Sequence, residues 1–245
     1  MPVQIIIDRE AILQQVKLSA KIPEFVEGIA NRQIITQAAT ELEIEITTAE
    51  LQEAADKFRL INQLHDAEET YNWLKKHAIS LDEFEEIINY NLLVSKLTTL
   101  LFKDKVEAYF AERTIDYLSA AIYEVILEDE DEAMELYYEI ECGENSFQEI
   151  ARQYIQDVEL RRKGGYRGIV YRRDLKPELS AAIFAANPPQ IIKPVTTASG
   201  IHLIWVEEII KPHLDNRLSS QIGLELFGDW LKQKAEEIQI ELAIK

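Results

Sequence analysis

The chain has 245 residues, a length that allows one large domain or two small ones. Hydrophobic residues make up 47% of it, which is typical of a packed core. The formal net charge of −18 repels phosphate backbones and anionic lipids, so we expect no nucleic-acid partner and no membrane insertion. The single cysteine, Cys142, forms no internal disulfide, and no signal peptide is visible, which together predict a cytoplasmic location.

The first half of the chain is predicted to be helical. Thr47 and Ser80 are each followed three residues later by a glutamate, which is the spacing of a capping box at a helix start. After Ser80, apolar residues recur at helical spacing and must face other helices: Phe84, Ile87, Ile88, Leu92, Leu97 and Leu101. Most of these residues are expected to form an ordinary helical core.

The second half is richer in glycine and proline and predicts a compact α+β domain of about 90 residues. Its order is strand, helix, turn, helix, strand. The predicted elements are Ile122–Leu127, a helix from Ser146 through Tyr154, a turn at Gly164, Gly165 and Gly168, a helix from Pro177 to near Ala186, and a central buried strand at Ile201–Val206.

Both ends of the chain carry an alternating apolar segment, Val3–Ile7 and Ile238–Leu242, and a helix at Leu214–Glu237 precedes the second one. An isolated strand leaves backbone groups unpaired, so we expect the two segments to pair with each other. The α+β unit would then be an insertion in a helical domain. Exchange of the terminal strand between two chains would make a homodimer through the same contacts.

Four segments of the second half resemble, in order, the helix, the glycine turn, the second helix and the final strand of a parvulin domain: Phe147–Asp157, Gly164–Gly168, Leu175–Phe184 and Pro194–Leu203. The flanks resemble the SurA/PrsA-type chaperone domain at Ile46–Leu51, Trp73–Phe84 and Leu226–Leu231. The resemblance implies an α+β chain in two parts. Residues 1–117 and 213–245 would form a helical SurA-like chaperone domain, and 118–212 an inserted parvulin-like domain.

That resemblance implies a peptidyl-prolyl cis-trans isomerase with chaperone function, acting on unfolded or proline-containing polypeptides. Rotation about an X-Pro bond needs no cofactor, no metal and no nucleophile, only an apolar cup for the proline and polar groups suited to the twisted amide. The acidic run Glu128–Glu132 occupies the loop that holds phosphate in phospho-specific parvulins. We therefore expect no phospho-specificity, and poorer handling of an acidic residue before the proline.

By the same resemblance, the polar catalytic positions are Asp157, Thr197, Ser199 and His202, and Glu124 occupies the place of a usual histidine. The apolar, substrate-binding positions are Leu175, Leu179, Phe184 and Thr196, where Leu179 and Thr196 replace phenylalanines. From the residues alone, His202 is equally well explained as a core histidine. These departures keep an alternative open: a weakly active or inactive holdase, or an adaptor in a protein or peptide export system.

Overall fold

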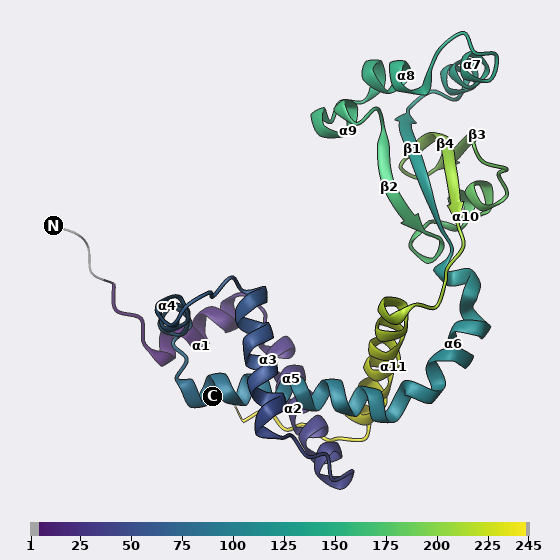
Figure 1. Ribbon diagram of the computed structural model, residues 1–245. Helices are drawn as coiled ribbons and strands as arrows, with labels where there is room; N and C mark the ends of the chain where they lie inside the picture. Colours follow the sequence, from purple (N-terminus) through teal and green to yellow (C-terminus); the bar gives the residue numbers. More distant parts are fainter. Residues whose placement is uncertain (1–4, 244–245) are drawn as a thin grey trace. The chain divides into compact units, whose positions relative to one another are not determined.

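The computed structural model describes residues 5–243, and its sheet has four antiparallel strands (Figure 1). Two compact units divide the chain. The first contains the residues up to Val106 and those from Ser219 onward, and the second is Glu107–Leu218. Each end of the chain therefore belongs to the first unit, and the second is inserted between them in the sequence. No helix among the described residues is long and apolar enough to cross a membrane.

The first unit is helical. Its helices are α1 (Arg9–Leu18), α2 (Ile22–Glu41), α3 (Thr48–Ile61), α4 (Ala67–His77), α5 (Leu81–Phe102) and most of α11 (Asn216–Glu236). Ile35 of α2, Leu97 of α5 and Phe227 of α11 share one buried cluster. This confirms that the C-terminal helix packs with the N-terminal helices, and the burial of its apolar stripe is what attaches it there.

Capping boxes begin several helices, as the sequence predicts. Thr47, Ser80 and Ser146 each accept from the backbone N–H three residues on, and the glutamate there returns the bond. At the start of α3, a hydrogen bond from Lys96 together with bonds from Thr47 lowers the pKa of Glu50 to about 2. These bonds satisfy N–H groups that a helix leaves free at its first turn.

The predicted pairing of the terminal strands is wrong for the described residues. Val3 lies outside them. Ile5 and Ile7, at one end, and Ile238, Ile240 and Leu242, at the other, are not in strands and are exposed. Their alternation satisfies the pattern of a strand, but a strand also needs a hydrogen-bonded neighbour, and neither segment has one within the described chain.

The second unit carries the sheet, in the strand order β2-β1-β4-β3. The strands are β1 (Ser119–Leu127), β2 (Tyr166–Tyr171), β3 (Gln190–Thr197) and β4 (Gly200–Ile210). The helices are α6 (Val106–Arg113), α7 (Glu130–Glu141), α8 (Phe147–Tyr154), α9 (Val158–Arg162) and α10 (Pro177–Phe184), of which α6 begins at the unit boundary. Figure 1 shows β1 and β4 in the middle of the sheet. The predicted central strand is thus confirmed as part of β4.

The two faces of the sheet have separate cores. Val125 and Leu203 face α7 and α8 in one cluster. Ile122 and Ile204 face α10 in the other, where Leu179 packs. Side chains alternate between the faces of a strand, so Glu124, two residues after Ile122, and His202, two before Ile204, lie on the α10 face.

Candidate functional site

A row of hydrogen-bonded polar side chains crosses the α10 face of the sheet. His202 Nδ1 lies 2.7 Å from Glu124 Oε1, and its Nε2 lies 2.8 Å from Thr197 Oγ1 and 3.2 Å from Ser199 Oγ. The two hydroxyl oxygens are 2.9 Å apart. Four of the five predicted polar residues are therefore brought together, and we call them, with this connectivity, the polar row.

The polar row follows from strand register. Val195 and Ile126 are the partners of His202 on the neighbouring strands, while Glu124 pairs with Ile204, so Glu124 and His202 are diagonal neighbours on one face. Gly165, just before β2, contacts β1 on the side away from β4. Its carbonyl oxygen accepts a hydrogen bond from the Glu124 N–H at 2.9 Å. Its φ is +86°, and a Cβ there would come within 3.1 Å of the Glu124 carbonyl oxygen, so glycine permits this close approach.

Two cations extend the polar row at its ends, and both were missed from the sequence. Arg167 Nε lies 3.1 Å from Glu124 Oε2, and Lys176 Nζ donates to Ser199 Oγ at 3.2 Å. The Glu124 side chain is only 10% exposed, and a buried carboxylate requires a charged or hydrogen-bonding partner. An acid within an apolar strand was therefore a signal for a polar or charged partner, although it did not identify Arg167, and no pattern in the sequence pointed to Lys176.

Two predicted site residues lie apart from the polar row. The Asp157 carboxylate caps α9 by accepting from the Leu160 N–H at 2.7 Å, and no hydrogen bond joins it to His202 among residues 5–243. Thr196 pairs with Ile201, whose side chain belongs to the cluster under α7 and α8. The strand register thus places Thr196 on the opposite face from His202, and Val195 takes its place beside the polar row.

An apolar surface adjoins the polar row on the same face. Leu179 is 7% exposed and belongs to the buried cluster beneath this surface. Leu175, Val195 and Phe184 are partly buried against the same cluster, and the Arg172 guanidinium lies over the Phe184 ring at 5.3 Å. Leu179, which the resemblance gave as a substrate-binding position, therefore offers little surface to a ligand, and Leu175 and Val195 offer more.

The acidic run directly follows β1 and leads into a helix that packs on the other face of the sheet. Asp129 caps α7, and Glu130, Asp131 and Glu132 form the first turn of that helix, where acids suit the helix dipole. Ala133 and Leu136 of α7 pack into the cluster opposite the polar row. The helix that these residues begin thus packs on the face that lacks His202. Within the described part of the chain, no group of three His, Cys, Asp or Glu side chains could hold a metal ion.

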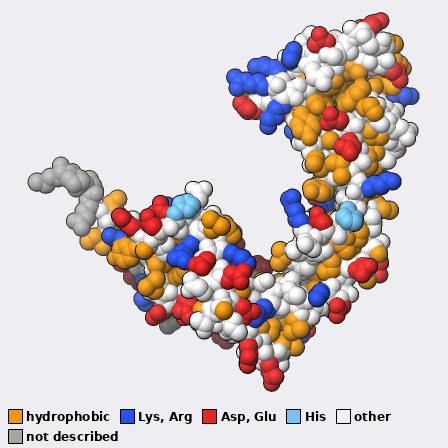
Figure 2. Space-filling view, in the orientation of Figure 1, with side chains coloured by type: hydrophobic (Ala, Val, Ile, Leu, Met, Phe, Trp, Pro, Cys, Tyr) orange, Lys and Arg blue, Asp and Glu red, His pale blue; other side chains and the backbone are white. Residues whose placement is uncertain are grey.

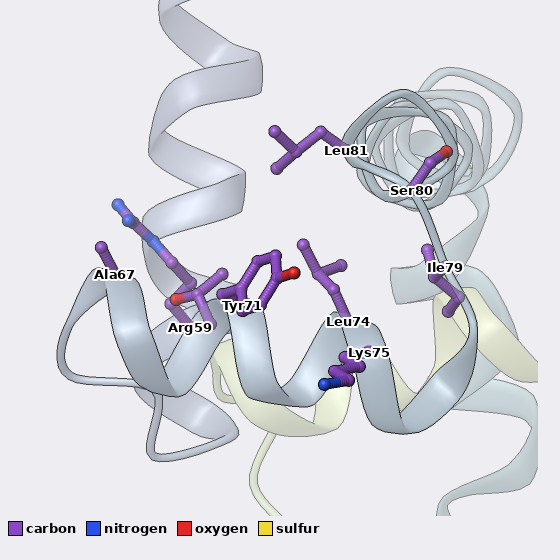
Figure 3. A pocket seen from close by; sticks show the side chains of 9 residues that line it. Arg59, Ala67, Tyr71, Leu74, Lys75, Ile79, Ser80 and Leu81 are labelled. Carbon is purple, nitrogen blue, oxygen red and sulfur yellow. The ribbon is translucent and has the colours of Figure 1, made fainter.

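The helical unit contains an open pocket of about 560 Å³ between α3, α4 and α5. Figure 3 shows Tyr71 and Leu74, from α4, together with Leu81 at the start of α5, around this space. Arg59 and Lys75 are also part of its lining. Tyr71 and Leu81 are 65% and 70% exposed, which is unusual for large apolar side chains that lie together.

Comparisons with known proteins show what the sheet unit is similar to. Residues 124–208 match the model of the PPIC-type PPIASE domain, known as Rotamase. The foldase protein PrsA of Halalkalibacterium halodurans is 26% identical over 190 residues, which cover 74% of this chain and 56% of that protein. The chaperone SurA of Shewanella oneidensis is 27% identical over 128 residues, covering 49% of this chain and 30% of that protein.

A crystal structure of peptidylprolyl isomerase PrsA from Bacillus anthracis has the same fold, with a TM-score of 0.52 and 22% identity. The superposition covers 89% of the present chain and all of the Bacillus anthracis chain. The present chain spans little more than half of the Halalkalibacterium protein. The rotamase match contains Glu124, the turn glycines, Thr197 and His202 in the order that the resemblance required. Residues 124–208 of the chain are therefore similar to a rotamase domain, and most of the chain is similar to PrsA foldases.

Proposed function

We propose that this chain is a peptidyl-prolyl cis-trans isomerase of the parvulin type with chaperone function, acting on unfolded or proline-containing polypeptides. The observation that carries the proposal is the polar row beside the apolar surface of Leu175, Leu179 and Val195, within the rotamase match. The proposed chemistry is non-covalent rotation of X-Pro bonds, and it does not depend on a phosphate.

The site can assist rotation about an X-Pro bond by favouring the twisted amide over the planar one. The barrier of about 20 kcal/mol comes from amide resonance, which the twisted bond loses. An apolar surface can hold the proline ring while fixed hydroxyl groups meet the twisted amide better than the planar one. Glu124 fixes His202, and His202 fixes the hydroxyls of Thr197 and Ser199, of which Ser199 is exposed to a client.

Replacing His202 with alanine is expected to lower kcat/KM on an Ala-Xaa-Pro-Phe peptide by about 10²-fold, because the two hydroxyls lose the group that orients them. A protease-coupled assay with purified full-length chain measures this. His202→Gln is a second variant, in which a side-chain amide can replace the imidazole as a donor to Glu124, and hydrogen exchange of β4 amides reports whether either variant is folded. Unchanged turnover in a folded variant would contradict the catalytic role of the polar row.

A second candidate function, a holdase without turnover, is favoured by the apolar surface of the helical unit. Leu60, Ile61, Tyr71 and Leu81 are each at least 65% exposed, and Figure 2 shows hydrophobic side chains among charged ones on this unit. Unfolded polypeptides expose apolar side chains that such a surface can cover. Holdase and isomerase activity are compatible in one chain. If the sheet unit does not turn over peptide, the chain would instead be a holdase or an adaptor in a protein or peptide export system.

The double variant Tyr71→Ser, Leu81→Ser is expected to weaken suppression of client aggregation while peptide turnover stays unchanged, because both residues lie in the helical unit. Light scattering of a chemically unfolded client measures the first quantity, and the peptide assay the second. Leu224→Ser, at an exposed leucine of α11 that does not line the pocket, is the matched control. Equal suppression by the double variant and the control would remove this surface from the client-binding proposal.

Three further expectations stay predictions. Cooperative unfolding of an isolated fragment 118–212 would support the proposed domain boundaries. A homodimer by exchange of terminal segments is supported by the exposed, unpaired Ile5–Ile7 and Ile238–Leu242, and sedimentation of the full chain tests it. The cytoplasmic location is supported by the single cysteine, Cys142, and cell fractionation tests it.

A further inference from the structure

The charges around the polar row differ from what the sequence suggested. Glu124 is paired with Arg167 and hydrogen-bonded to His202, so it presents little uncompensated negative charge. The Glu130–Glu132 carboxylates begin the helix that covers the opposite face. Repulsion of an acidic client residue by Glu124 is therefore weakened.

Lys176 supplies a positive charge at the exposed end of the polar row, next to Ser199. Its ammonium group contacts Ser199, the exposed hydroxyl of the polar row, and no ion pair joins Lys176 to an acid within the described part of the chain. Asp174 lies 4.0 Å from Arg173, and Glu178, in the first turn of α10, forms no ion pair with Lys176 in residues 5–243. Lys176 thus remains available to an anion from outside.

Lys176 also lies between the two apolar positions of the site. Leu175 precedes it, and Leu179 follows one helical turn later, with both side chains in the cluster on the α10 face. A proline held against this surface would bring its neighbouring residue close to the ammonium group. Ser199 adds a hydroxyl that can share in binding an oxygen atom.

We infer that Lys176 and Ser199 form a subsite for a side-chain carboxylate next to the client's proline, which makes Lys176 a specificity-determining residue. This inference rests on the proposed isomerase function. It predicts that clients with glutamate before proline are handled better than those with the neutral isostere glutamine. The pair is partly exposed, so the expected preference is about two- to fivefold and decreases as salt is added.

The test compares Ala-Glu-Pro-Phe with Ala-Gln-Pro-Phe peptides within each variant, both for kcat/KM and for binding by competition with a fluorescent peptide. The wild-type chain is expected to favour the glutamate peptide at low salt. Lys176→Met should bring the ratio close to one, and Lys176→Glu should reverse it. Lys193→Met, at an exposed lysine of β3 outside the polar row, should retain the wild-type ratio.

The outcomes separate this inference from the isomerase proposal. Turnover of both peptides without a preference for glutamate, or a preference that survives Lys176→Met, would overturn the subsite and leave the isomerase in place. Binding that favours glutamate and depends on Lys176, without turnover, would support the subsite and overturn the isomerase. Neither binding nor turnover of either peptide would contradict both.

Discussion

Replacing Gly200 with alanine is expected to destabilise the sheet unit by about 3–5 kcal/mol and to abolish peptide turnover. Gly200 follows the two-residue turn between β3 and β4 and has a φ of +126°. A Cβ there would lie 2.7 Å from Ile126 Cγ2 and 2.9 Å from the Leu127 carbonyl oxygen. The backbone oxygen cannot move away without breaking the β1–β4 ladder, so overpacking adds to the cost of the strained φ.

The same turn carries the hydroxyls of the polar row, which is why activity should fall along with stability. Thr197 ends β3 and Ser199 precedes Gly200, so any displacement of the turn moves both away from His202. Native-state hydrogen exchange of β1 and β4 amides measures the stability of this unit alone. The peptide assay measures turnover under the same conditions.

Gly168→Ala is the matched control. Gly168 also has a positive φ, +83°, but a Cβ there would meet no atom within 4 Å. This variant has to overcome only the unfavourable backbone conformation and should cost about 1–2 kcal/mol. If the two alanine variants are equally stable, steric contact with β1 is not what requires glycine at position 200.

The parts of the fold that the sequence predicted well depend on local chemistry. The capping boxes at Thr47, Ser80 and Ser146 need only residues three apart, and the helix at Pro177 needs only a ring that suits the first turn. The central position of β4 followed from residues that are apolar on both faces. Each of these patterns lies within a few consecutive residues, so it can be recognised without knowing the tertiary structure.

The two edge strands were missed for the converse reason. β2 contains Gly168, and β3 contains Pro194 and Lys193, which are residues that disfavour a strand when taken alone. An edge strand tolerates them because one side of its backbone needs no partner within the sheet. The terminal segments present the opposite case, since their alternation was correct for a strand but no partner strand accompanies it among residues 5–243.

The candidate site was predictable as a set of residue types but not as a set of contacts. The motif order brought Glu124, Thr197, Ser199 and His202 to one face, and the structure places them within hydrogen-bond distance. Asp157 has the residue type that the motif requires, yet a local bond to Leu160 engages its carboxylate. Competition between a local cap and a distant partner depends on tertiary distances, which no spacing in the sequence reveals.

Removing the Glu124 carboxylate is the change expected to affect the polar row most. Glu124→Ala leaves the His202 imidazole, whose side chain is 5% exposed, without the partner of its Nδ1, and leaves Arg167 without its anion. Loss of one member of a buried pair costs about 3–5 kcal/mol, because the remaining polar group stays buried and unsatisfied. Arg167→Ala is the control, since that side chain is 49% exposed and its loss should cost about 1 kcal/mol or less.

Loss of activity in Glu124→Ala could result from unfolding alone, so a third variant is needed to separate stability from function. Replacing both Glu124 and His202 with leucine removes the buried pair together, which is often close to neutral when the new side chains pack well. We expect this double variant to recover most of the stability that Glu124→Ala loses, as measured by hydrogen exchange at β1 and β4 amides. Its peptide turnover should nevertheless remain about 10²-fold below that of the wild-type chain, because Thr197 and Ser199 are no longer oriented. A folded double variant with wild-type turnover would show that the polar row only stabilises the sheet, and isomerisation would then have to depend on the apolar surface of Leu175 and Val195.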